Sequence, residues 1–241
     1  MIVKSNALIT YLKLDGSYID SFTTNNISGC IIFLNLDRYI IEESIIKDNC
    51  IVHKISIINR KNNNQKSVYE FEDFDYIKKH KSKISDLSSM KVARLDSNSK
   101  GEIVYAFTNE YRVFLYDGVS TITLISRDIE PAKISKKWLY WKYGDELKDN
   151  SGRKYILPKY YSVIRNVMFD EKDNLWIYVC VKEGAFLHRY LPNGKFLNSY
   201  QLDIDINDFS PRRIEYHFGY FYILVYADDM TLEVYRAKAP D

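Results

Sequence analysis

The chain has 241 residues, with 34 Lys and Arg against 32 Asp and Glu, and a formal net charge of +2. This near balance argues against a general nucleic-acid-binding protein, and no segment approaches the roughly 18 apolar residues of a membrane-spanning helix. Hydrophobic residues make up 46% of the chain and aromatic residues 15%, including 21 Tyr, which favours half-buried β-strands. We therefore expect one all-β domain over residues 1–241.

The first residues and the cysteines bear on the compartment. The stretch "MIVKSNALITYL" has a short, interrupted apolar run and lacks the layout of a secretory signal. The protein is therefore cytoplasmic, or its natural N-terminus lies outside this sequence. Cys30, Cys50 and Cys180 are far apart and form no C-x-x-C pair, so neither a disulfide framework nor a zinc site is predicted.

A hairpin pattern recurs along the chain and sets the length of a repeat. An apolar-x-x-Tyr or apolar-x-x-Leu strand end, followed by a polar turn, occurs at 9–12, 113–116, 187–190 and 232–235, with a weaker copy at 55–58. Successive copies lie 46, 58, 74 and 45 residues apart. The first and last spacings match the ~40–50 residues of a four-stranded propeller blade. The two longer spacings contain the segments 72–90 and 127–163, which do not read as strands.

Within each repeat, short apolar runs alternate with turn residues, as in antiparallel sheets. The predicted blade-like units are 8–22 (partial), 29–71, 91–126, 164–201 and 212–237. The clearest unit has runs at 165–169, 175–181, 186–190 and 196–201. In the unit before it, Asp96 matches Asp170 and "EIVYAF" matches "LWIYVC".

The two inserted segments carry the helical periodicity that the rest of the chain lacks. Residues 74–87 have a basic face. Residues 131–147 begin at Pro131, offer Ser135 as an N-cap, and repeat apolar residues at Ile134, Trp138 and Trp141. We expect a short helical insertion here.

These patterns predict a β-propeller of four-stranded antiparallel blades, about five of which are visible. Such a sheet buries both of its faces only by packing on neighbouring blades. A β-sandwich is the alternative fold. It does not explain why the hairpin at Gly16 returns at Gly194, 178 residues later, which is four blade lengths.

The segments "YYSVIRNVMFDEKDNLWIYV" and "FLHRYLPNGKFLNSYQL" are similar to six-bladed β-propellers of the NHL/TolB-like group, particularly the Bacteroidetes-type cell-envelope propellers. In that group a proline-containing loop leads to an apolar strand, an Asp-x-x-x-Asn/Gly turn, a Trp/Tyr-Val strand and Tyr-x-x-x-Gly-Lys. The residues at those places here are Pro158, Asp170, Asn174, Trp176 and Gly194–Lys195. The resemblance covers most of 90–237 and the hairpin at 8–22.

The resemblance implies six blades, an export or lipoprotein signal, and a cell-envelope or secreted protein. This sequence shows no signal peptide and opens inside a blade. We expect either an N-terminally shortened version or a smaller, rearranged ring in which the N-terminal hairpin completes the last blade.

The segment 127–163 is the candidate binding site because it is long, aromatic and basic, and long loops in compact domains tend to be functional or mobile. Aromatic faces beside Lys or Arg hold a sugar ring or the apolar patch of a partner. Alternatively, these aromatics cover the channel mouth or pack between blades. The predicted ligand-binding residues are Trp138, Tyr140, Trp141, Arg153, Lys154, Tyr160 and Tyr161.

The histidines and acids do not form a catalytic motif. His53, His80, His188 and His217 lack the spacing of metal ligands, and no P-loop, dinucleotide or G-x-S-x-G motif is present, so no cofactor is expected. Asp96 and its counterpart Asp170 have two possible roles. They are channel-facing acids or calcium ligands, as in propeller lactonases, or they are turn carboxylates that accept backbone N–H groups.

The sequence favours a non-catalytic β-propeller that binds a protein, peptide or glycan at its top face, near 127–163. The alternative is a calcium-dependent propeller hydrolase or lactonase with acids on the central channel. A third interpretation is a truncated gene product with no independent role.

Overall fold

The structure is a computed structural model. It describes residues 2–5, 8–12, 17–23, 31–35, 37–47, 50–62, 64–73, 84–85, 93–136, 139–140, 155–156, 159–203, 213–226 and 232–240. The chain divides into two compact units, Met1–Ile77 and Lys78–Asp241. No helix in the described residues has the length and apolar character needed to cross a membrane.

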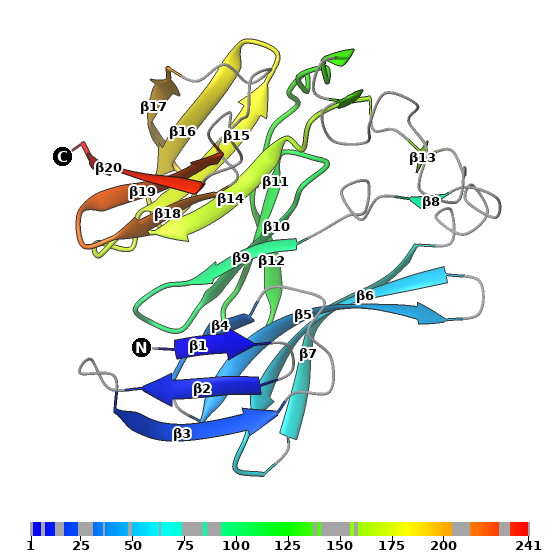
Figure 1. Ribbon diagram of the computed structural model, residues 1–241, viewed down its shortest axis with the longest axis vertical. Helices are drawn as coiled ribbons and strands as arrows, with labels where there is room; N and C mark the ends of the chain where they lie inside the picture. The colour runs from blue at the N-terminus through cyan, green and yellow to red at the C-terminus, as the bar shows by residue number, and fades with distance from the viewer. Residues whose placement is uncertain are drawn as a thin grey trace. The chain divides into compact units, whose positions relative to one another are not determined.

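The first unit contains two antiparallel sheets in which each strand pairs with the next one in the chain. The three-stranded sheet comprises β1 (Ile2–Ser5), β2 (Leu8–Leu12) and β3 (Tyr18–Thr23) (Figure 1). The four-stranded sheet comprises β4 (Ile31–Phe33), β5 (Arg38–Lys47), β6 (Cys50–Asn59) and β7 (Asn64–Asp73). The buried apolar side chains of the second sheet include Ile40, Ile41, Val52 and Ile55.

The second unit contains three antiparallel sheets in succession, drawn from green to red in Figure 1. The first sheet comprises β9 (Ala93–Ser97), β10 (Ile103–Phe107), β11 (Arg112–Tyr116) and β12 (Thr121–Ser126). The second comprises β14 (Ile164–Phe169), β15 (Leu175–Val181), β16 (Gly184–Tyr190) and β17 (Phe196–Leu202). The third comprises β18 (Arg213–His217), β19 (Tyr220–Tyr226) and β20 (Leu232–Lys238). Two short strands, β8 (Ile84–Ser85) and β13 (Tyr155–Ile156), pair in parallel.

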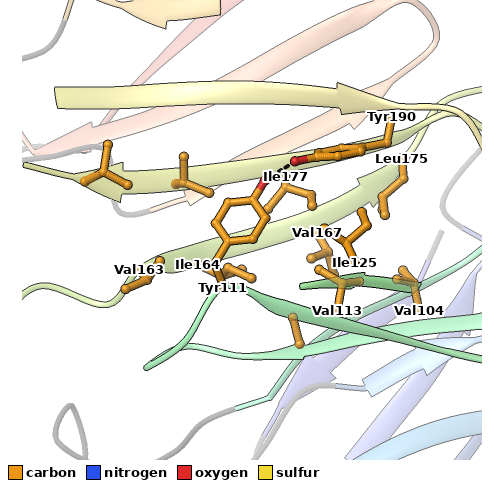
Figure 2. Packing of buried hydrophobic residues seen from close by; sticks show 13 residues of the cluster. Val104, Tyr111, Val113, Ile125, Val163, Ile164, Val167, Leu175, Ile177 and Tyr190 are labelled. Atoms are coloured by element: carbon orange, nitrogen blue, oxygen red, sulfur yellow. Dashed lines mark hydrogen bonds between the residues drawn. The ribbon is translucent and has the colours of Figure 1, made fainter. Parts of the chain in front are cut away.

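The three sheets of the second unit pack face to face through their first strands, because β14 contacts both β9 and β18. Strand β15 is buried at every position, so its alternating side chains serve two separate cores. Leu175, Ile177 and Val179 pack with Val104 and Val113 of the preceding sheet, as Figure 2 shows in part. The opposite face of the strand packs toward the following sheet through Trp176, Tyr178 and Cys180, together with Ile214 and Phe221.

This radial stacking of small antiparallel sheets is β-propeller architecture, and it confirms the predicted all-β class and the four-stranded blades. The strands of the sheet β14–β17 also begin and end within two residues of the predicted runs. Four of the described sheets are blades with a buried apolar face: β4–β7, β9–β12, β14–β17 and the three-stranded β18–β20. The prediction of about five visible blades of a six-bladed type is therefore wrong in number for the described residues.

The predicted helical insertion is also not seen as a helix with defined bounds in the described residues. Pro131 and Lys133, where the helix was expected to begin, instead form isolated β-bridges with Val181 and Tyr160. One helical-type hydrogen bond follows, from the Leu139 N–H to the Ser135 carbonyl. The extended start reflects competition from Val181 at the end of β15 and from Tyr160, which supply backbone partners that a helix would forgo. Residues 141–147 and the basic stretch 74–83 lie outside the described residues.

The turn between β16 and β17, at "LPNGK", requires a glycine because the neighbouring blade lies too close for a side chain. Gly194 has φ +80°, and a Cβ atom there would lie 2.7 Å from the carbonyl oxygen of Leu124 in β12. This hairpin therefore packs closely against the outermost strand of the preceding sheet. Gly101 also has a positive φ, +76°, but open space surrounds it.

We predict that Gly194→Ala lowers the free energy of unfolding by about 2–4 kcal/mol, because left-handed strain and a backbone clash add together. Gly101→Ala serves as the matched control and carries only the strain, about 1–2 kcal/mol. Urea unfolding of both variants measures the difference. Equal losses would contradict the proposed close packing of the two blades.

Candidate functional site

The described ends of the segment 127–163 are anchored to the end of β15. The Lys182 N–H donates to the Glu130 carbonyl, and Pro131 bridges Val181. The Tyr161 N–H then donates to the Ala132 carbonyl, which ties the two ends of the segment together. The segment therefore leaves and rejoins the blade at one fixed place.

The predicted ligand-binding residues are divided by this arrangement. Tyr140 and Tyr160 are exposed, with 44% and 46% of their surface accessible. Tyr161 is buried and belongs to the core between β14–β17 and β18–β20. The remaining predicted residues lie outside the described residues. They are Trp138, Trp141, Arg153 and Lys154.

At the first residue of this segment, the surface is hollowed between two blades. We call this hollow the Arg127 groove, and its volume is about 410 Å³. It lies between the end of β12 and the turn that joins β16 to β17. Its lining residues are Leu124, Ile125, Ser126, Arg127, Tyr190, Gly194 and Phe196.

The guanidinium of Arg127 is held in the groove by aromatic rings. Its Cζ lies 5.7 Å from the centre of the Tyr111 ring and 5.5 Å from that of Phe196, within cation–π range of both. Its Nη1 donates a hydrogen bond to the Tyr190 hydroxyl over 3.3 Å. These contacts fix a cation at a partly apolar surface.

Behind the guanidinium lies a buried chain of polar groups. The Tyr111 hydroxyl is 2.7 Å from the Tyr190 hydroxyl, the dashed contact in Figure 2, and 2.7 Å from Nδ1 of His188. Because a guanidinium only donates, the direction that uses every donor runs from Arg127 through Tyr190 and Tyr111 to His188. This hydrogen-bonded network joins two blades, since Tyr111 directly precedes β11, whereas His188 and Tyr190 lie at the end of β16.

Two groups in this network, His188 and Tyr111, are neutral at physiological pH. Burial, together with the nearby Arg127 charge, lowers the pKa of His188 to about 4. Burial also raises the pKa of Tyr111. The Arg127 guanidinium is therefore the one charge that these four side chains carry.

The sequence reasoning placed His188 correctly in a strand but did not find this network. His188, Tyr190 and Arg127 are separated from Tyr111 by 77, 79 and 16 positions, and no motif connects them. Arg127 directly follows β12, where an exposed basic residue is common. Only the docking of one blade on the next brings the four side chains together.

A second hollow, of about 230 Å³, lies where the first turns of three sheets meet. Its acids are occupied by hydrogen bonds. Asp170 accepts the N–H groups of Lys172 and Asn174 and the indole N–H of Trp176. Asp173 accepts the N–H of Ser99 from the preceding sheet.

The pairing register corrects the predicted equivalence of Asp96 and Asp170. Ser97 pairs with Ile103, and Phe169 pairs with Leu175, so the residue equivalent to Asp170 is Asn98. Asn98 accepts the N–H groups two and four residues ahead, as Asp170 does. The predicted match of Asp96 is therefore displaced by two residues, and the match of "EIVYAF" to "LWIYVC" by one, because spacing alone did not fix where the turn begins.

Asp96 instead bridges two blades from within β9. Its carboxylate accepts the N–H of Ser97 over 2.8 Å and that of Phe169 in β14 over 2.7 Å. Both Asp96 and Asp170 therefore act as acceptors of backbone N–H groups. In the described part of the chain, no group of three or more His, Cys, Asp or Glu side chains is arranged to bind a metal.

Comparisons with known proteins give no family assignment. No protein-family model matches the chain, and no curated protein matches it. Among solved structures, a catalytically inactive virginiamycin B lyase from Staphylococcus aureus, with quinupristin, is 12% identical at a TM-score of 0.41. The match covers 98% of this chain and 64% of that one.

Two further structures have similar scores. A putative exported protein from Bacteroides fragilis is 10% identical at a TM-score of 0.45, covering 92% of this chain and 61% of that one. The β-propeller domain of the Trilobed protease from Pyrococcus furiosus is 11% identical at a TM-score of 0.39, covering 97% and 58%. This chain thus spans less than two thirds of each. At such low scores, neither fold nor function is carried over, and the fold given above follows from strand pairing and packing.

We predict that Tyr111→Phe lowers the free energy of unfolding by about 1–3 kcal/mol, because it leaves buried polar groups of His188 and Tyr190 unpaired. Tyr116→Phe is the matched control, since the Tyr116 hydroxyl donates to the nearby Gly118 carbonyl within its own hairpin. Chemical denaturation compares the two variants. A loss at Tyr111 no larger than at Tyr116 would show that the chain of hydroxyls contributes nothing to blade docking.

The carboxyl of Asp96 predicts a pH dependence of stability. Burial raises its pKa from 3.8 to about 6, although the two N–H donors oppose the rise. Between these values the unfolded chain loses the proton while the folded chain keeps it, so stability falls as the pH rises, by up to roughly 3 kcal/mol.

Asp96→Asn removes this titration. We expect the stability of the variant relative to the wild type to increase between pH 4 and pH 7, measured by urea unfolding at several pH values. The opposite titration of His188 is present in both proteins and cancels in the difference. A difference that does not change with pH would contradict a buried, protonated Asp96.

Proposed function

We propose that this chain is a non-catalytic β-propeller binding module that holds a protein, peptide or glycan at the surface formed by the segment 127–163 and the adjoining Arg127 groove. One observation carries the proposal. A fixed cation and exposed aromatic side chains, Phe196, Tyr140 and Tyr160, occur in this region, and that combination suits recognition rather than bond cleavage.

The described acids support the same interpretation. A calcium-dependent hydrolase or lactonase would use Asp96 and Asp170 as metal ligands. The carboxylate oxygens of both residues instead accept hydrogen bonds from backbone N–H groups. The Tyr111–His188 pair is buried within a network and joins two blades. We also propose a cell-envelope location, which the NHL/TolB-like resemblance of residues 90–237 implies.

The direct test is a binding screen of the full chain on arrays of oligosaccharides and peptides, followed by titration of the best binder. We expect saturable binding that the double variant Tyr140→Ala/Tyr160→Ala weakens by about tenfold, the loss expected of two aromatic contacts. Tyr235→Ala is the matched control, because Tyr235 is 54% exposed on β20 and lies outside the segment.

Two results would overturn the proposal. One is the absence of saturable binding to any array member. The other is turnover of a lactone or ester by the wild-type chain that requires added calcium.

A further inference from the structure

We infer that the Arg127 groove binds an anionic group, a carboxylate, phosphate or sulfate, attached to a flat or apolar moiety that contacts Phe196. This inference rests on the proposed function and names the chemical group that the binding surface recognises. Three features of the groove support it: the charge at Arg127, the shape of the hollow, and the hydrogen bonding behind it.

Within the described ranges, no ion pair joins the Arg127 guanidinium to a carboxylate. Among the acids close to Arg127 in the sequence, Glu130 pairs with Lys182 at 2.9 Å and Glu110 lies 3.9 Å from Arg112. Asp128, the next residue, is exposed and does not line the groove. Arg127 is the one ionised residue among those that line the groove, so the lining presents a positive charge to a ligand.

The guanidinium is also oriented in advance. Two aromatic rings and the Tyr190 hydroxyl hold it, so little side-chain freedom is lost when an anion binds. One of its five N–H donors is used by Tyr190, and the planar fork of the remaining donors suits two oxygens of a carboxylate or phosphate. A lysine would offer a point charge without this geometry.

The hollow is large enough for more than an inorganic ion. Its 410 Å³ falls within the ~300–1,000 Å³ of small-molecule sites. Leu124, Ile125 and the 45%-exposed ring of Phe196 supply apolar walls beside the cation. An aryl or sugar-ring anion therefore matches both the charge and the surface.

The test is calorimetric titration of the full chain with four probes at constant ionic strength: benzoate, phenyl phosphate, phenyl sulfate and the uncharged benzyl alcohol. We expect saturable binding of at least one anion, with benzyl alcohol weaker by about tenfold or more, since charge-assisted hydrogen bonds are lost. Comparing the three anions distinguishes a carboxylate from a phosphate or sulfate ligand.

Arg127→Gln should weaken the bound anion by about tenfold or more, and Arg127→Lys should weaken it less. Arg236→Gln is the matched control, because Arg236 also lies over a tyrosine ring, 4.7 Å from the centre of Tyr220, but on β20 away from the groove. Phe196→Ala keeps the arginine and should weaken the aryl anions. Thermal unfolding of each variant establishes that it is folded.

Equal affinity for benzyl alcohol and the anions, no anion binding, or equal losses in the Arg127 and Arg236 variants would each overturn this inference. Its failure is distinguishable from failure of the proposed function. Array binding that depends on Tyr140 and Tyr160 would then persist without any dependence on Arg127.

Discussion

The structure of residues 93–240 depends on one constraint: a small antiparallel sheet with two apolar faces must bury both. Strand β15 shows this most clearly, because none of its seven residues faces water. A sheet of this kind is unstable alone and requires a neighbour on each side. The packing of β14 on β9 and β18, and the polar contacts between turns, follow from that requirement.

Polar groups reinforce the apolar interfaces at their edges. Asp96 and Asp173 each accept an N–H group across the junction between β9–β12 and β14–β17. Glu171 does the same toward the next sheet, through the Gly219 N–H. The acids gathered at these turns are therefore joints between blades. This explains why Asp96 and Asp170, for which the sequence left open a role as calcium ligands, have oxygens that already accept backbone N–H groups.

The sequence predicted those features that depend on local pattern. Apolar runs bounded by turn residues located the four strands of β14–β17. The recurrence of the Gly16 hairpin at Gly194 indicated a repeat. The alignment of the two blades was misjudged by two residues at Asp96 and by one residue in the following strand, because residue spacing does not show where a turn begins. The start of the helix expected from Pro131 was replaced by β-bridges to Val181 and Tyr160, which come together only in the folded chain.

The Arg127 groove lay beyond sequence reasoning for a related reason. The groove depends on a hydrogen-bonded network whose four side chains come from two blades, and each is unremarkable in its own strand or turn. They are Arg127, Tyr190, Tyr111 and His188. Their meaning comes from docking, which places a cation between two rings and in front of neutral hydroxyls. The proposed binding role thus uses the same blade junction that stabilises the fold.

Native-state hydrogen exchange, followed amide by amide, tests most directly whether the blades of residues 93–240 depend on one another. If both faces of β15 need their neighbours, the central amides of β10, β15 and β19 should share one opening free energy, equal to that for unfolding the unit. Independent opening of β18–β20, at a free energy well below that of β15, would contradict the mutual dependence of the blades.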